Sequence, residues 1–397
     1  MTLLRNAQVF APGPRGRCDL LIGGGQILAI DATLPAVALA EEIDLRGARL
    51  IPGLIDGHVH VTGGGGESGF ASRVPPIALS ELTRAGITTV IGLLGTDGTT
   101  RTIADLVART LGLREEGLSA WCYTGSYQCP PHTLTGSVRG DIVFVDPILG
   151  VGELAISDHR SSQPSFEELV RVAADCHVAG LTSGKAGHVH LHLGDGTRGL
   201  DLVRRAIVET ELPARVFQPT HVNRNRRLFE ESVALAIAHG LPIDVTAFPA
   251  DDDGYDAPTA IARCLAAPGF PAQRLTCSSD GAGCLPVFDR DGVLVEMDIG
   301  RPATLHGALV ALLPDFALER VLPVFTANVA QQLRLGRKGR IEVGADADLV
   351  VLAADHGIDS VMARGRWMVR AGQPMMLGMF ERSSTRPPSS SPAGAIS

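Results

Sequence analysis

Two histidines separated by one residue, His58 and His60, follow an apolar run and precede four consecutive glycines. Side chains alternate between the two faces of a β-strand, so both imidazoles would project from one face at the end of that strand. Imidazole is a common ligand of divalent metal ions. The spacing therefore predicts part of a metal site, although two polar residues beside a loop would give the same pattern.

Further residues of metal-ligand type lie in or just after later apolar runs. The run 188–193 holds three histidines on one face, but at about 3.3 Å per residue His188 would lie about 13 Å below His192, so only His192 is expected to reach the strand's end. Alone, His221 could be a hydrogen-bonded core residue and Asp280 a turn carboxylate. Their joint placement predicts one cluster, with candidate ligands His58, His60, Glu153, His192, His221 and Asp280.

Four imidazoles and two carboxylates exceed the needs of one tetrahedral zinc ion and suit two divalent ions about 3.5–4 Å apart. Glu153 is the candidate bridge between them. Bound metal lowers the pKa of water to about 7, so a bridging hydroxide would be the nucleophile. Asp280 would take its proton as general base and return it to a leaving amine as general acid. Zinc is the expected metal, and manganese or cobalt would also fit.

The elements that must position these residues follow a regular order. Between residues 54 and 339, short apolar runs alternate with helical patterns such as those over 103–111, 166–179 and 228–238. Eight such units match an α/β fold of the TIM-like (β/α)8 barrel type, in which functional residues lie at the carboxyl ends of the strands. The expected strands cover 54–60, 87–94, 118–123, 151–156, 188–193, 216–222, 243–248 and 275–279.

The two ends of the chain have a different pattern. Short apolar runs separated by Gly and Pro over residues 1–53 predict antiparallel β structure, and a β pattern returns over residues 340–381. We therefore expect both ends to form one small β-sandwich domain beside a catalytic barrel of residues 54–339. Residues 382–397 are rich in Ser, Pro, Arg and Ala, which predicts a disordered tail.

The composition excludes several classes of protein. The chain has 397 residues, 45% of them hydrophobic, and a net charge of −8, which gives no basic surface for nucleic acid. No signal-peptide core and no apolar run of membrane-spanning length is present, so we expect a cytoplasmic protein without a membrane partner. Seven cysteines without a CxxC pair suit reduced thiols.

Taken together, these residues resemble the amidohydrolase superfamily. The HxH pair follows PGLID at 52–56, and the C-terminal part carries TANVA at 326–330, KGRI at 338–341 and GADADL at 344–349. A narrower likeness, from about residue 1 to 381, is to the isoaspartyl (β-aspartyl) dipeptidases of that superfamily. It is carried by GGGGE at 63–67, GLLGTD at 92–97, YTGSY at 123–127, ISDHR at 156–160, PTHVNR at 219–224 and SSDG at 278–281.

The resemblance implies hydrolysis of dipeptides in which aspartate is linked through its side-chain carboxyl group. It implies that Glu67 holds the substrate's α-amino group, that Arg160 and Arg224 hold its carboxylates, and that Tyr127 supports the developing oxyanion. It also implies a homo-oligomer, with an octamer suggested by the family. Independently, guanidinium groups just past candidate ligands suit small carboxylates, although Arg160 could instead pair with Asp158. Further implied contacts to the substrate come from Gly65 and Thr96.

Two positions depart from the family pattern. The family commonly bridges its metals with a carbamylated lysine, whereas this chain has Glu153 there and no lysine nearby. Because glutamate is shorter by about 4 Å, we expect the strand to approach the metals more closely at residues 150–153, where glycine permits it. Cys284 stands where the family tends to carry a substrate-contacting serine, and a thiol is a weak donor.

Three other interpretations are open. An amidohydrolase specific for cyclic amides or N-acyl amino acids would use the same metals. Its substrates, however, lack the free amine that Glu67 is expected to bind. GxGxxG at 64–69 could indicate a nucleotide site, but Pro75-Pro76 interrupts the helix that this motif requires. A non-catalytic assembly protein would have lost ligands, and the five outside the bridge are all present.

Overall fold

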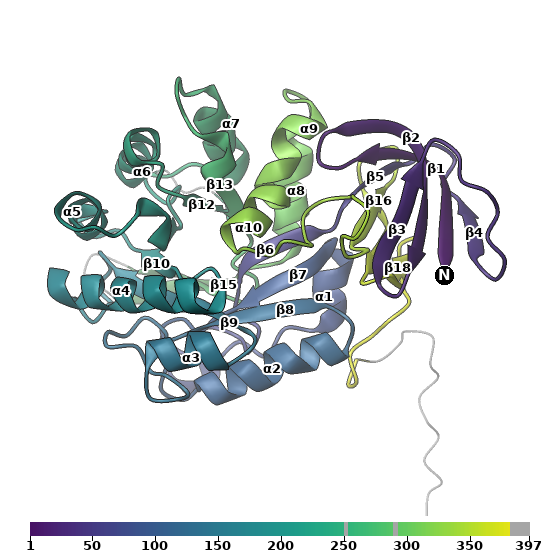
Figure 1. Cartoon of the computed structure of the whole chain (residues 1–397). Helices are drawn as coiled ribbons and strands as arrows, with labels where there is room; N and C mark the ends of the chain where they lie inside the picture. The colour runs from purple at the N-terminus through teal and green to yellow at the C-terminus, as the bar shows by residue number, and fades with distance from the viewer. Residues whose placement is uncertain (250–252, 289–292, 382–397) are drawn as a thin grey trace, which may run out of the picture.

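The computed structural model describes residues 1–249, 253–288 and 293–381, and it places a β/α barrel beside a sheet built from both ends of the chain (Figure 1). The predicted disordered tail lies outside the described residues. The eight barrel strands are β6 (Leu54–Val59), β7 (Ile87–Gly92), β8 (Ser119–Thr124), β9 (Ile148–Ile156), β10 (Val189–Leu193), β11 (Phe217–Thr220), β12 (Ile243–Thr246) and β13 (Leu275–Ser278).

The barrel strands are parallel and follow one another in sequence order. Strands β6 to β11 form one hydrogen-bonded sheet, and β12 pairs with β13. The ring closes where His60 N donates to Gly281 O at 2.9 Å, beside a parallel bridge between Val59 and Gly281. These strands confirm the predicted (β/α)8 barrel.

One helix follows each barrel strand and lies outside the ring (Figure 1). In the longest of them, which spans residues 166–183, the buried side chains recur at intervals of three and four residues, as expected for a helix with one face on a core. The helices are α1 (Leu79–Arg84), α2 (Ile103–Glu115), α3 (Val138–Phe144), α4 (Phe166–Ser183), α5 (Asp201–Glu209), α6 (Arg226–His239), α7 (Ala257–Ala266) and α8 (Ala303–Leu312), with α9 (Leu318–Val321) and α10 (Ala327–Gln332) after them.

Side-chain caps fix where several helices begin. The Ser165 side chain accepts a hydrogen bond from Glu168 N, and Ser165 N donates one to the Glu168 carboxylate, which forms a capping box at the start of α4. Helices α2, α3 and α6 begin at Thr102, Ser137 and Asn225. Each of these side chains accepts one hydrogen bond from a backbone N–H of the first turn. None of the helices in the described part of the chain is long and apolar enough to cross a membrane.

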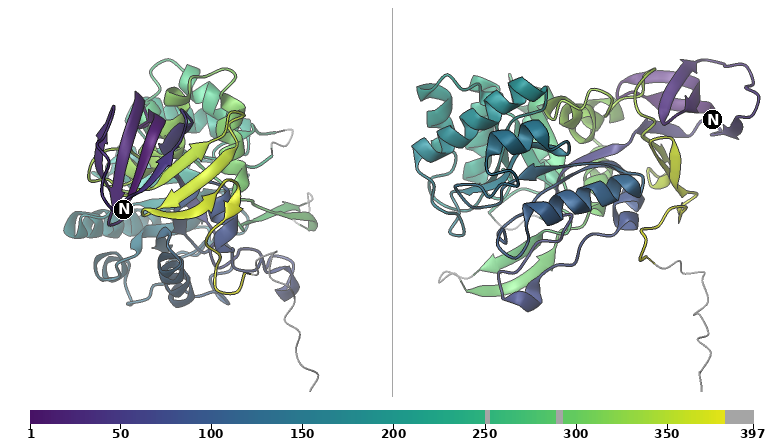
Figure 2. Two further views of the ribbon diagram at one scale, coloured as in Figure 1. Left: turned by 90° about the vertical axis from the view of Figure 1, so that its right-hand side faces the viewer. Right: turned by 60° about the horizontal axis from the view of Figure 1, so that its bottom comes forward.

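The ends of the chain form one nine-stranded sheet (Figure 2, left). Strand β5 lies between β1 and β16 and pairs with both, so it joins the block of N-terminal strands to the block of C-terminal strands in one sheet. The sheet folds back on itself, because Ile27 N donates to Ala345 O at 3.0 Å, and it encloses its own hydrophobic core. Its strands are β1 (Thr2–Phe10), β2 (Pro14–Gly23), β3 (Gln26–Asp31), β4 (Glu41–Asp44), β5 (Arg49–Pro52), β16 (Leu349–Leu352), β17 (Ile358–Ala363), β18 (Arg366–Arg370) and β19 (Gln373–Pro374).

Two further strands follow the last barrel strand. β14 (Cys284–Phe288) and β15 (Leu294–Ile299) pair antiparallel, and β14 begins at Cys284, beside the barrel mouth. All seven cysteines of the chain are free thiols, as expected.

Candidate active site

The carboxyl ends of five barrel strands bring the candidate ligands together. His58 lies in β6, Glu153 in β9 and His192 in β10, whereas His221 and Asp280 directly follow β11 and β13. All five side chains are buried. The spacing argument therefore located a real cluster.

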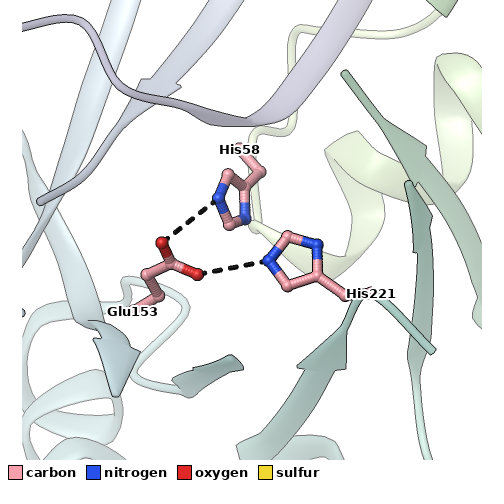
Figure 3. A group of neighbouring side chains, drawn as sticks. All are labelled: His58, Glu153 and His221. Carbon is pink, nitrogen blue, oxygen red and sulfur yellow. Dashed lines mark hydrogen bonds and ion pairs between the residues drawn. The ribbon is translucent and has the colours of Figure 1, made fainter. Parts of the chain in front are cut away.

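Glu153 lies between two imidazoles (Figure 3). Its Oε1 is 3.6 Å from His58 Nε2, and its Oε2 is 3.4 Å from His221 Nε2. Ligand atoms of these three residues lie within 4.8 Å of one another. The carboxylate thus bridges histidines from opposite parts of the ring.

A second group shares His58 and adds His60 and Asp280. Asp280 Oδ1 is 3.1 Å from His60 Nε2 and 3.4 Å from His58 Nε2. His60 Nε2 is also 3.4 Å from Glu153 Oε1, so the two groups are continuous. The described residues therefore form two adjoining groups of candidate metal ligands.

The donor set fits divalent cations. His58 Nε2 and Asp280 Oδ1 are buried atoms without a hydrogen bond, and both point into the cluster. A buried polar atom without a partner is costly unless a ligand completes it. Imidazole nitrogen and carboxylate oxygen are the ligand types that zinc and similar ions accept.

Buried charges in the cluster shift the pKa values of its members. Burial alone would raise the pKa of Glu153, but His58, His192 and His221 outweigh it and hold that pKa well below its usual range. Burial likewise opposes protonation of His60, and the carboxylates of Asp280 and Glu153 nevertheless raise its pKa to about 9. The site therefore favours positive charge beside its two carboxylates.

A β-bulge carries Glu153 into the site. Between β9 and β10 the register advances by three residues on β9 and two on β10, which leaves an extra residue around Glu153. A Cβ atom on Gly150 would lie 2.3 Å from His188 O, so only glycine permits this close approach of the strands. The expected closer approach of the strand to bound metals stays a prediction.

Backbone turns direct the ligands that follow β11 and β13. His221 and Asp280 both have left-handed backbone conformations, with φ of 59° and 55°. Such conformations are uncommon outside glycine and gather at functional sites. The left-handed conformation at His221 also ends β11 earlier than the sequence predicts. Asp56 holds the second turn, because Ser279 N and Oγ both donate to its carboxylate, at 3.1 and 2.5 Å.

A narrow pocket of about 20 Å³ lies beside the two groups of candidate ligands. On its wall Thr96 Oγ1 donates to Glu67 Oε1 at 2.8 Å, while Glu67 Oε2 is buried without a hydrogen bond. Burial raises the pKa of the Cys284 thiol to about 12, so this side chain is neutral. The cavity lining includes the predicted residues His60, Gly65, Glu67, Thr96, Tyr127, Glu153, Asp280 and Cys284.

Arg160 stands between two carboxylates at the edge of this cavity. Its Nε and Nη2 donate to Asp158 at 3.0 and 2.8 Å, and its Nη1 is 3.6 Å from Glu67 Oε1. The alternative considered from the sequence, a pair with Asp158, is thus present. Asp158 also contacts a candidate ligand, since its Oδ2 is 2.9 Å from His192 Nε2.

His192 lies beside the two ligand groups rather than within them. Its Nδ1 is 3.2 Å from Glu153 Oε2 and 2.8 Å from the hydroxyl of Tyr127. Burial raises the pKa of Tyr127 well above its usual range, so its phenol keeps the proton that it can donate. His192 therefore connects Glu153 to Tyr127 and, through Asp158, to Arg160.

Comparison with known proteins now bears on this site. The sequence model of the amidohydrolase family matches residues 49–368. The chain belongs to the amidohydrolase family. Two structures of a β-aspartyl dipeptidase from Fervidobacterium islandicum AW-1 are similar to this amidohydrolase. One, in complex with the dipeptide β-Asp-Leu, has 40% identity and a TM-score of 0.91 over 95% of this chain and 98% of its own. The other has 38% identity and a TM-score of 0.85 over 95% and 99%.

Curated relatives match only locally. Adenine deaminase from Deinococcus radiodurans is 44% identical over 61 residues, which are 15% of this chain and 11% of the deaminase. The family assignment therefore rests on the family match and the two dipeptidase structures, and these confirm the resemblance inferred from the motifs.

One predicted site residue of this amidohydrolase lies elsewhere. Arg224 Nη1 donates to Leu193 O at 2.7 Å, and its Nε is 3.5 Å from Asp195 Oδ1. The side chain lines a separate surface depression. The tight turn after β11, in which Arg224 N donates to His221 O, directs the side chain there. Its role in substrate binding stays a prediction.

Sequence reasoning missed three residues of the site. Asp158 lies in the ISDHR motif, but its bond to His192 crosses between strands and leaves no local signal. A Cβ on Gly95 would lie 2.7 Å from His60 Cε1, so that glycine makes room for the ligand. His190, expected to lie below the site, contacts His58 Nδ1 at 2.9 Å, and the alternation HxHxH was the signal that could have found it.

Proposed function

We propose that this amidohydrolase is a metal-dependent dipeptidase that releases aspartate from β-aspartyl dipeptides. The observation that carries the proposal is the cavity in which Glu67 adjoins the candidate ligands His60, Glu153 and Asp280. An acidic group beside a metal centre suits a substrate with a free amine next to the bond to be cleaved. The 40% identical dipeptidase in complex with β-Asp-Leu supports the same choice.

The proposed centre holds two divalent ions, with zinc the expected metal. Bound ions would lower the pKa of water and polarise the scissile carbonyl. Glu153 would bridge the pair, because each of its oxygens already faces a different histidine. The ligands proposed are His58, His60, Glu153, His192, His221 and Asp280.

Charged groups on the other wall would orient the substrate. Glu67 Oε2, which has no hydrogen bond of its own, would accept from the α-ammonium group. Arg160 would bind a carboxylate with its fork of N–H groups, and Arg224 would join it after leaving Leu193 O. Gly65, Thr96 and Cys284 complete the wall.

Two side chains would act on the reacting atoms. The Tyr127 hydroxyl would donate to the oxygen of the scissile carbonyl as negative charge develops there. Asp280 is held as a carboxylate because its imidazole neighbours outweigh burial and keep its pKa well below the usual range. As general base it would take a proton from the attacking water and pass it to the leaving amine.

Kinetics with three substrates test the proposal. We expect turnover of β-Asp-Leu, little turnover of α-Asp-Leu and little of N-acetyl-β-Asp-Leu, whose amine is blocked. Chelation should abolish activity, and zinc should restore it. Equal turnover of the acetylated substrate would point instead to an N-acyl amino acid hydrolase, and activity unaffected by complete metal removal would refute the metal centre.

A further inference from the structure

His190 lies beneath the candidate metal centre, on the same face of β10 as His192. Its Nε2 is 2.9 Å from His58 Nδ1, and the two rings meet edge to face with centroids 5.0 Å apart. His58 belongs to both groups of candidate ligands. A change at His190 would therefore act on the ligand that the two groups share.

The surroundings of His190 fix its ring. Tyr123 stacks on it with centroids 5.2 Å apart and an interplanar angle of 16°, and the Tyr123 hydroxyl bonds to His188 Nε2 at 3.0 Å. Gly152 leaves the space for this stack, since a Cβ there would lie 2.8 Å from His190 Cβ. The ring of His190, which is 1% exposed, is thus held against His58.

Proton placement decides what the contact does. A neutral imidazole that offers its Nε2 lone pair to a cation keeps its proton on Nδ1. In His58 that proton points at His190 Nε2, which must then act as the acceptor. The other nitrogen, His190 Nδ1, is buried with no hydrogen-bond partner in the described chain, and it can carry the remaining proton.

We propose that His190 is a positioning residue. Its Nε2 accepts a hydrogen bond from the Nδ1–H of His58 and thereby holds the Nε2 lone pair of His58 toward the metal centre. This inference rests on the proposed metal site. A parallel exists at His221, where the Thr246 hydroxyl lies 2.8 Å from Nδ1 and fixes that ring. Partners of this kind orient metal-bound histidines and tune their basicity.

The choice of a neutral partner has a chemical consequence. Metal-bound histidines usually pair with a carboxylate, a carbonyl or water. A neutral imidazole adds no negative charge to a centre where Glu153 and Asp280 already supply two carboxylates. The ions would keep more of their positive charge, which favours ionisation of bound water.

A matched pair of variants tests the role. His190→Gln and His190→Met have side chains of nearly equal length, but only glutamine carries an acceptor for the His58 proton. We expect His190→Met to raise the zinc Kd, measured by chelator competition, by about 10- to 100-fold. His190→Gln should stay near the wild-type value. His306→Met is the control, because His306 lies in α8 and its Nε2 contacts His356 O rather than a candidate ligand or a neighbour of His190.

Each outcome decides between the alternatives. Equal zinc Kd values for His190→Met and His190→Gln, or an equal loss in His306→Met, would overturn the positioning role. If the wild-type protein binds no zinc, the proposed metal centre fails and this inference fails with it. Should His190→Met not fold by circular dichroism, His190→Gln decides alone, since a loss of more than about tenfold there contradicts an acceptor role.

Discussion

The two walls of the pocket differ in the source of their positive charge. On the metal side, Glu153 and Asp280 face imidazoles only. On the substrate side, Glu67 and Asp158 face the guanidinium of Arg160. The first wall balances its carboxylates with imidazoles, whose protons an incoming cation would displace, whereas the second carries a permanent guanidinium. We infer that the metal side determines whether the protein reacts and that the substrate side determines with what.

The largest expected effect comes from removing the negative charge of Glu153, the proposed bridge. In Glu153→Gln an amide replaces the carboxylate that faces both His58 and His221. Ion polarisation is worth several kcal/mol, so we expect kcat to fall about a thousandfold or more, with loss of bound zinc. Metal analysis and turnover of β-Asp-Leu measure both effects. Retention of two zinc ions and full activity would refute the bridge.

The wild-type protein offers a second test of the bridge, because a carbamylated lysine would require bicarbonate. The chain has two lysines, and both are engaged elsewhere: Lys185 Nζ donates to Val145 O at 2.7 Å and Lys338 Nζ to Asp348 at 2.5 Å. Loading zinc without bicarbonate should therefore give the same activity as loading with it. A requirement for bicarbonate would show that a carbamate is needed after all.

On the substrate side, Glu67→Gln should act on specificity and leave the metals in place. It removes the charge that would bind the α-ammonium group, an interaction worth about 1.5–3 kcal/mol, or about 10- to 150-fold in kcat/KM. Zinc content should not change. Thr96→Val, which removes only the hydroxyl that donates to Glu67, serves as the milder comparison. A loss of zinc in Glu67→Gln would contradict the separation of the two walls.

Metal affinity should depend on pH through the histidines of the metal side. The pKa of His60 is raised to about 9, so below that pH an incoming ion must displace a proton. The apparent zinc affinity should therefore rise with pH between about 7 and 9, by about tenfold per pH unit for each displaced proton, and level off above. Chelator competition at a series of pH values measures this slope, and an affinity independent of pH would be inconsistent with it.

The smallest expected effect is at Cys284. Its neutral thiol lines the cavity beside Glu67, and Cys284→Ser supplies a better donor. A neutral hydrogen bond contributes about 0.5–1.5 kcal/mol, so we expect KM for β-Asp-Leu to fall by about two- to tenfold. Cys129→Ser, which changes a thiol that does not line this cavity, should leave KM unchanged. A rise in KM for Cys284→Ser would mean that the thiol itself suits the substrate better.

Much of the fold could be predicted because barrel strands leave a local signature. Apolar runs bounded by glycine and polar residues gave all eight strands to within a few residues, and the capping residue Ser165 marks the start of α4. The strand expected over 216–222 ends early, at Thr220, since the left-handed backbone at His221 ends β11. The cytoplasmic location, the domain limits and the oligomeric state stay predictions.

Residues in or just after a barrel strand could be placed at the candidate site from the sequence. His58 and Glu153 lie in strands of the ring, and the convergence of such strands brought them together. Arg224 follows a turn, where sequence spacing says nothing about the direction of a long side chain. The bonds of Asp158 to His192 and of His190 to His58 join different strands, so they depend on packing across the barrel.

The sheet that joins both ends of the chain has a consequence for synthesis of the protein. Strand β5 pairs with β16, which is made after nearly the whole barrel has left the ribosome. Until then one edge of the N-terminal strands has no partner, and such edges invite pairing with other chains. The newly made N-terminal segment therefore waits for the end of translation, and chains stalled before residue 349 should aggregate through that exposed edge.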